Sequence, residues 1–192
     1  MGLVDLVKGF PGKPSHPPLT DASIGAYAAG ALMLLFGALG VEEGPMAHGA
    51  LLAISLGLLL AAPTALTGLL DWLKLAKGSP ARKVATIHLF TMVAATVVFA
   101  LTWLAHLDGY DTDRVGTLAA VLGLAGFALL AVGGYLGGTL AFVYGVRVLN
   151  RPDTPIGDAL VPGRANAGRR QPAARRSGEP TAGASRAGFG RT

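Results

Sequence analysis

Four histidines, His16, His48, His88 and His106, are the residues of this 192-residue sequence best suited to chemistry near neutral pH. An imidazole can exchange a proton, bind a metal ion or ligate haem iron. The sequence contains no cysteine, which excludes disulfides, thiolate-ligated iron–sulfur clusters, covalently attached haem and a cysteine nucleophile. A b-type haem needs only His or Met ligands. The histidines are therefore the first candidates for cofactor binding.

The depth of each histidine depends on four apolar segments, at about 24–41, 49–70, 84–107 and 115–146. Each segment approaches or exceeds the ~20 residues that cross the apolar core of a bilayer. Only 14% of the residues are charged, well below the ~25% of a typical soluble domain. We therefore predict an all-α polytopic membrane protein whose four transmembrane helices form an antiparallel bundle.

Positive charge is confined almost entirely to one side of this four-span arrangement. Of the 16 Lys and Arg residues, only Arg114 falls on the other side, and the first and third connections are acidic. By the positive-inside rule, both termini and the middle connection are cytoplasmic. We therefore expect a multi-pass membrane protein whose two acidic connections face outward. The net charge of +5 indicates attraction to lipid headgroups rather than to nucleic acid, because most of the excess follows the last span.

The chain divides into three parts at the ends of the apolar region. Residues 1–21 form a cytoplasmic arm that is amphipathic near its start and then proline-rich. Residues 22–150 form the four-helix transmembrane domain. Residues 151–192 form a basic cytoplasmic tail with few large apolar side chains. Such a tail buries too little apolar area to fold alone, so we predict that it is disordered.

Prolines shape both the arm and the second span. Three prolines at 13–18 favour an extended backbone there, because a proline disfavours helix in the residue before it. Thr20 or Asp21 then suits the N-cap of the first helix. Pro63 is expected to kink the second span, with nearby threonines satisfying the freed carbonyl. The kink serves helix packing in one interpretation and opens a ligand cavity in the other.

Two pairs of ionisable residues have matched depths on the second and third spans. His48 and His106 lie near the outer ends, and two facing imidazoles are what a bis-histidine b-type haem requires. An imidazole is also stable at the headgroup level without any ligand. Asp71 and His88 lie near the cytoplasmic ends, where a hydrogen bond between them is the favoured interpretation. All four histidines stay candidates for cofactor binding.

A polar cluster is predicted at the cytoplasmic face, where the ends of the first three spans meet. We expect it to pin the arm across the bundle by hydrogen bonds. The alternative is a site for a polar headgroup, a quinone or a metal ion, since ionisable groups at membrane depth often have a function. The residues placed there by their depth are His16, Asp21, Asp71 and His88.

Four glycines near the end of the last span are predicted to pack helices. Gly133, Gly134, Gly137 and Gly138 form two overlapping GxxxG patterns, which let helix backbones approach closely in a membrane. Packing within the chain is the simpler interpretation, and a homodimer contact is the alternative. The last apolar run is longer than the bilayer core requires, so this helix must tilt or project from the membrane.

Several segments resemble a bacterial family of membrane proteins known as domain of unknown function 2231. The matching residues are GKPSHPPLTDASIG at 12–25, PTALTGLLDW at 63–72, His88, and GYLGG at 134–138. Together they extend over about 12–147. The resemblance implies four transmembrane helices, in agreement with the apolar segments.

The resemblance also implies which residues belong to shared motifs. His16, Asp21, Asp71, Trp72 and His88 coincide with motif positions of the family, all at the cytoplasmic face, so the resemblance adds Trp72 to the polar cluster. A bacterial family also implies the bacterial plasma (inner) membrane as the location. Some relatives carry a Rieske iron–sulfur domain after the fourth helix, which implies an association with electron transfer. The tail of this chain has no Cys and no His, so it cannot hold such a cluster. The family's activity is unknown, and no catalytic residue is carried over.

Three functions can be weighed against these residues. The leading hypothesis is a non-catalytic membrane subunit or scaffold. It would associate with a respiratory or redox partner, or with further copies of itself as a homo-oligomer. The second is an electron carrier that binds b-type haem or quinone. The third is a small transporter, which the lack of a charge near the midpoint of any span disfavours. No residue pattern for hydrolysis, phosphate binding or two-carboxylate catalysis is present, and no metal site is assigned.

Overall fold

A computed structural model describes residues 7, 9–10, 12–162 and 164, which form mainly four long helices. The last of these helices continues into a single π-helical turn, η1 (Thr139–Val143). The long helices are α2 (His16–Ala38), α3 (Glu43–Leu73), α4 (Pro80–Ala105) and α6 (Thr117–Gly138). The short elements are β1 (Gly9–Phe10), β2 (Lys13–Pro14), α5 (Gly109–Thr112) and α7 (Ile156–Leu160).

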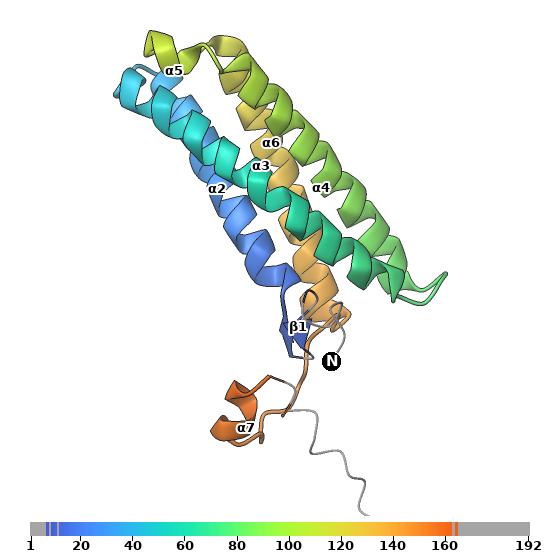
Figure 1. Cartoon of the computed structure of the whole chain (residues 1–192). Helices are drawn as coiled ribbons and strands as arrows, with labels where there is room; N and C mark the ends of the chain where they lie inside the picture. The colour runs from blue at the N-terminus through green and yellow to red at the C-terminus, as the bar shows by residue number, and fades with distance from the viewer. Residues whose placement is uncertain (1–6, 8, 11, 163, 165–192) are drawn as a thin grey trace, which may run out of the picture.

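The long helices form an up-and-down antiparallel bundle (Figure 1). Helix α2 packs most extensively against α3, and α4 packs most extensively against α6. Contacts of α2 with α6, and fewer contacts of α3 with α4, close the bundle. Each helix therefore neighbours the helices before and after it in the chain, as short connections require.

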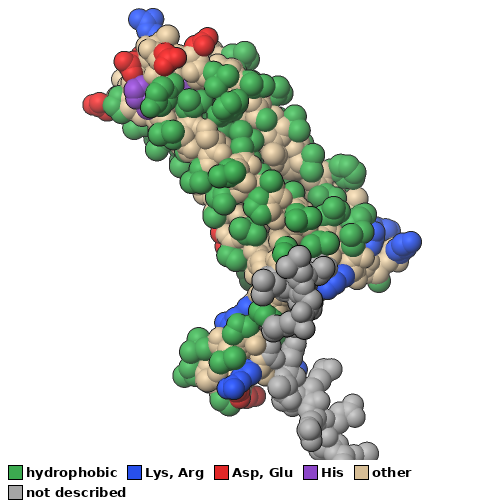
Figure 2. All heavy atoms as spheres, viewed as in Figure 1, with side chains coloured by type: hydrophobic (Ala, Val, Ile, Leu, Met, Phe, Trp, Pro, Cys, Tyr) green, Lys and Arg blue, Asp and Glu red, His purple; other side chains and the backbone are tan. Residues whose placement is uncertain are grey.

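All four long helices are long and apolar enough to span a membrane. Their most apolar 18-residue windows have mean hydropathies from 1.5 to 2.1. Apolar side chains cover the flank of the bundle, while acidic residues gather at one end and basic residues toward the other (Figure 2). An apolar exterior of this extent suits lipid rather than water as the surrounding solvent. The prediction of an all-α fold with four membrane-spanning helices is confirmed.

Small residues at intervals of three and four positions form the helix interfaces. The buried residues of α6 are Ala119, Gly123, Gly126, Leu130 and Gly133, which share one face. This face meets α2 and α4. A side chain on Gly126 would collide with the ring of Phe99 on α4. Glycine thus allows the backbones to approach, which is how membrane helices associate without a hydrophobic driving force.

The two GxxxG patterns of α6 point in different directions. Gly133 is buried, and a side chain there would overlap Met92 of α4. A Cβ on Gly137 would lie 3.3 Å from the ring of His88. Gly134 is exposed and would meet nothing within 4 Å. Gly133 and Gly137 therefore face other helices of the bundle, whereas Gly134 faces away from it. A Cβ on Gly138 would lie 3.9 Å from the ring of Phe142 in η1.

The first helix begins earlier than the sequence pattern indicates. Helix α2 starts at His16, with Ser15 as its N-cap, so Thr20 and Asp21 lie inside the helix. The predicted extended stretch ends correspondingly earlier, because Pro17 and Pro18 fall in the first helical turn. A missing N–H has no cost there, and the fixed φ of proline suits a helix. Most of the expected amphipathic segment lies outside the described residues.

The last helix ends before position 146. After η1, positive φ angles at Gly145 (63°) and Arg147 (64°) turn the chain away from the helical path. The segment then continues to α7, below the bundle in Figure 1. This short helix lies at the start of the tail that was predicted to be disordered, and residues 165–192 of that tail lie outside the described part of the chain.

Candidate functional site

His16 connects the first helix to the second at the basic end of the bundle. This is the end where α2 and α4 begin and α3 and α6 finish. The Nδ1–H of His16 donates to the Thr64 carbonyl at 3.0 Å, and Nδ1 also lies 3.3 Å from the Thr67 hydroxyl. Since a carbonyl can only accept, Nδ1 carries the proton. Gly68 leaves room for the ring, because a Cβ there would lie 2.7 Å from Cε1 of His16.

Two threonines close to Pro63 form the α3 side of this contact. The helix continues through Pro63 to Leu73. The Thr67 hydroxyl lies 2.9 Å from the carbonyls of both Pro63 and Thr64, and the Thr64 hydroxyl donates to Leu60. The proline's missing N–H frees the Leu59 carbonyl. The threonines bond other carbonyls, those of Leu60, Pro63 and Thr64, and not the freed one as expected. Thr67 and the Thr64 carbonyl both face His16.

His88 makes the equivalent connection between α4 and α6. Its Nδ1–H donates to the Gly133 carbonyl at 2.9 Å, and the ring lies beside Gly137. The two imidazoles, His16 and His88, are close enough to interact electrostatically. The absence of a side chain at Gly137 leaves room for the ring beside the α6 backbone.

Asp71 pairs with an arginine that the sequence analysis did not single out. Its Oδ1 lies 3.3 Å from Nε of Arg147, and the side chains are only 12% and 22% exposed. His16 interacts electrostatically with both charges. The inner polar cluster thus consists of His16, Asp71, His88 and Arg147. The expected Asp71–His88 hydrogen bond is replaced by this ion pair and by the bond of His88 to Gly133.

Two residues of the predicted cluster lie elsewhere. Asp21 is exposed on α2, and the described residues give it no hydrogen bond or ion pair. Trp72 points to the α3–α4 connection, where its Nε1–H donates to the Thr86 hydroxyl at 3.0 Å. The guanidinium of Arg82 lies over the Trp72 ring, 4.0 Å from its centroid. Of the five residues expected together, Asp71 and His88 each lie within electrostatic range of His16.

The other two histidines connect elements at the acidic end of the bundle. His106 is 1% exposed, and its Nε2–H donates to the Ala47 carbonyl of α3 at 2.9 Å. His48 lies with Nε2 2.7 Å from the Tyr110 carbonyl and 2.9 Å from Oδ1 of Asp113. Both rings therefore tie α3 to the connection between α4 and α6.

This geometry does not fit a haem between His48 and His106. Iron needs an unprotonated ring nitrogen from each ligand. In both rings Nε2 carries a proton because it donates to a carbonyl. The remaining nitrogen of His106, Nδ1, is buried against the backbone of Gly109. In His16 and His88, by contrast, Nδ1 carries the proton and Nε2 keeps its lone pair, and Nε2 of His16 lies 3.4 Å from the Thr20 hydroxyl.

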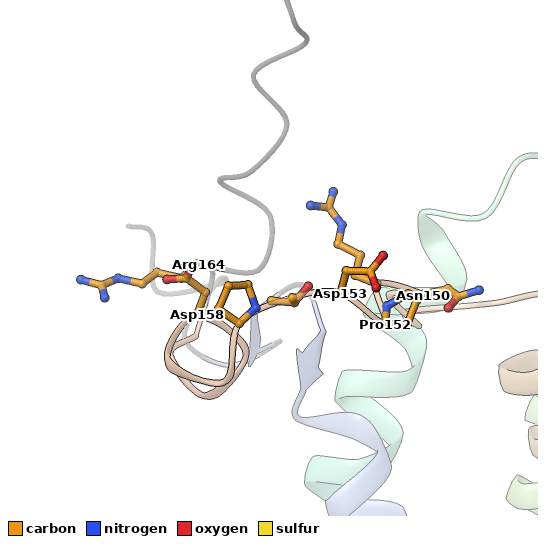
Figure 3. A pocket seen from close by; sticks show the side chains of 8 residues that line it. Asn150, Pro152, Asp153, Asp158 and Arg164 are labelled. Carbon is orange, nitrogen blue, oxygen red and sulfur yellow. The ribbon is translucent and has the colours of Figure 1, made fainter.

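Two hollows in the surface of the described residues lie away from the inner polar cluster. One has a volume of about 420 Å³ and lies on the segment after the bundle, where Asp153, Asp158 and Arg164 contribute to its lining (Figure 3). A smaller hollow of about 180 Å³ lies between α3 and α4 at Ser55, Leu58 and Trp103. Among the described residues, no group of three or more His, Asp or Glu side chains is placed to hold a metal ion.

Comparison with known proteins identifies the family of this chain. The family model described as predicted membrane protein (DUF2231) matches residues 12–150. No curated protein and no solved structure matches the chain. The matched region contains all four long helices, the four histidines and both residues of the Asp71–Arg147 pair. The chain therefore belongs to the DUF2231 family of predicted membrane proteins.

Proposed function

We propose that this protein is a non-catalytic membrane subunit or scaffold of the bacterial plasma membrane, with both termini in the cytoplasm. One observation carries the proposal. Each of the four histidines donates a ring N–H to a backbone carbonyl of a different segment. The side chains best suited to chemistry are thus used to hold the elements of the bundle together.

Lateral association within the membrane supports the scaffold role. The apolar flank of the bundle is available for contact with lipid or with another membrane protein. Gly134 presents a small residue on the outer face of α6, where a second helix can approach closely. A homo-oligomer or a respiratory or redox complex fits this surface, and the Rieske domain implied for some relatives favours a redox partner.

A second candidate function rests on the inner polar cluster. The Nε2 atoms of His16 and His88 keep lone pairs, and the two rings interact electrostatically. Two such acceptors near one another suit the hydroxyl groups of a reduced quinone or the iron of a b-type haem. An electron carrier with its ligand at the basic end is therefore the alternative to the scaffold.

Visible absorption spectra of the full chain separate these functions. The protein is purified from its native membrane in a mild detergent, and spectra are recorded before and after reduction with dithionite. The scaffold predicts a featureless visible spectrum. A Soret band that shifts on reduction, and that is lost in His88→Asn, would establish the haem carrier instead. Extraction of the same sample with organic solvent, followed by chromatography, tests for a stoichiometric quinone.

A further inference from the structure

The connection between α3 and α4 carries an uncompensated positive charge. Residues 74–83 contain Lys74, Lys77, Arg82 and Lys83, and no acidic residue. The nearest acid in the chain, Asp71, is turned inward and paired with Arg147. All three lysines are exposed. Within the described residues, nothing neutralises the charge of this basic hairpin.

Arg82 fixes the shape of the basic hairpin. Its Nη1–H groups donate to the carbonyls of Leu75 at 2.7 Å and Trp72 at 3.3 Å, which satisfies the end of α3. The guanidinium also lies over the Trp72 ring. Ser79 accepts from the Arg82 N–H at 3.2 Å and so caps α4. The backbone that carries the three lysines is therefore held in one conformation, with Arg82 used internally.

Apolar side chains continue directly from the lysines along both helices. On α3, Leu73 is 57% exposed, next to Lys74. On α4, Phe90 is 68% exposed, and Ile87 lies one turn from Lys83. The surface therefore changes from cationic to apolar within about two helical turns, in the same order as the headgroup and the acyl chains of a phospholipid. A free anion would use only the first half of this surface.

We propose that the basic hairpin binds an anionic phospholipid. The phosphodiester lies among Lys74, Lys77 and Lys83, and the acyl chains lie along Leu73 and Phe90. An ammonium group acts as a point charge toward phosphate, and the N-terminus of the 26-residue helix α4 adds a favourable dipole. The lipid would fix the depth of this end of the bundle and strengthen the contact of α3 with α4.

Native mass spectrometry of the full chain tests the proposal directly. The protein is released from detergent micelles that contain equimolar phosphatidylglycerol and phosphatidylcholine, and the ratio of the two bound lipids is measured. We expect retention of phosphatidylglycerol. In the variant Lys74→Gln, Lys77→Gln, Lys83→Gln, the preference should fall by about tenfold or more, since each cation near the surface contributes roughly a fivefold factor.

Two matched variants control for charge and for position. Replacement of the same three lysines by Arg keeps the charge and should keep the preference. The variant Lys13→Gln with Arg164→Gln removes exposed cations outside the hairpin and should also keep it. Unfolding curves of all variants in the same detergent establish that the substitutions at exposed positions leave the bundle folded.

Three results would overturn the proposal. The triple Gln variant could retain its preference for phosphatidylglycerol, or the variant Lys13→Gln with Arg164→Gln could lose as much of that preference as the triple variant. Either result would show that the anionic lipid binds elsewhere. Inorganic phosphate at a concentration comparable to that of the lipid could displace phosphatidylglycerol. That outcome would show a phosphate site without recognition of the lipid.

Discussion

His16, His48, His88 and His106 each bond a carbonyl that belongs to another element, and these bonds fall at both ends of the bundle. A hydrogen bond away from water is electrostatically stronger than the same bond in water. Removal of one partner costs about 1–3 kcal/mol when it leaves a buried group unsatisfied. Interactions of this size, repeated at both ends, restrict how the four helices can slide past one another.

Asp71 and Arg147 provide a test of the inner polar cluster at the residue scale. We predict that Asp71→Asn and Arg147→Gln each lower the free energy of unfolding by roughly 1–3 kcal/mol, because each removes one charge of a mostly buried ion pair. Breaking a fully buried ion pair costs about 3–5 kcal/mol, and this pair is partly exposed, so the expected loss is smaller. The double variant should lose less than the sum. Chemical unfolding in detergent measures this coupling.

A second double-mutant cycle, which combines Asp71→Asn with His88→Ala, is the control for the Asp71–Arg147 cycle. These residues bond different partners, so their effects should add. Strong coupling of Asp71 to His88 and none to Arg147 would contradict the observed ion pair.

The sequence predicted three residues of the inner polar cluster but not their bonds. The depth of a side chain in the membrane can be predicted from its position along an apolar segment. These positions placed His16, Asp71 and His88 at the same end of the bundle. Backbone carbonyls are present at every position, so no residue pattern identifies those of Thr64 and Gly133 as acceptors. Arg147 was hidden among the arginines of the tail, because its position depends on the turn after η1.

At the scale of elements, adjacent glycines on α6 allow a controlled comparison. We predict that Gly133→Leu lowers the free energy of unfolding by about 1–3 kcal/mol, the usual cost of overpacking, because its side chain would overlap Met92. Gly134→Leu should leave stability nearly unchanged, since that position faces open space. Thermal unfolding of both variants measures the difference.

Size-exclusion chromatography of the same variants addresses the homodimer alternative. A smaller oligomer in Gly134→Leu, with the monomer equally stable, would place a second copy on the outer face of α6. Equal destabilisation by both substitutions would contradict the orientation of the helix.

Helix number and type followed from the apolar segments, whereas several helix ends did not. The beginning of α2 was missed because two adjacent prolines suggested an extended chain, although the first turn of a helix accepts them. The end of α6 was missed because the residues through 146 are apolar. Apolar character reports the solvent around a segment and does not distinguish a regular helix from the π-turn and bend found there.

The whole molecule has opposite charges at its two ends, and this asymmetry predicts its orientation. The α3–α4 connection carries lysines, and the α2–α3 connection carries Glu42 and Glu43. We predict that a reporter fused after Arg151 is cytoplasmic and that one inserted at 42–45 is on the opposite side of the membrane. Paired fusions to alkaline phosphatase and to a fluorescent protein measure each location. The reverse orientation at either site would contradict the four-span topology.

The histidines hold helices together instead of binding a ligand in the proposed scaffold. A comparison of His88→Asn with His88→Ala separates these two roles, because the amide N–H₂ of Asn can donate from nearly the position of Nδ1, whereas Ala cannot. We predict that His88→Asn keeps most of the free energy of unfolding and that His88→Ala loses about 1–3 kcal/mol. Equal losses in the two variants, accompanied by loss of a bound group, would show that His88 is a ligand and contradict the claim.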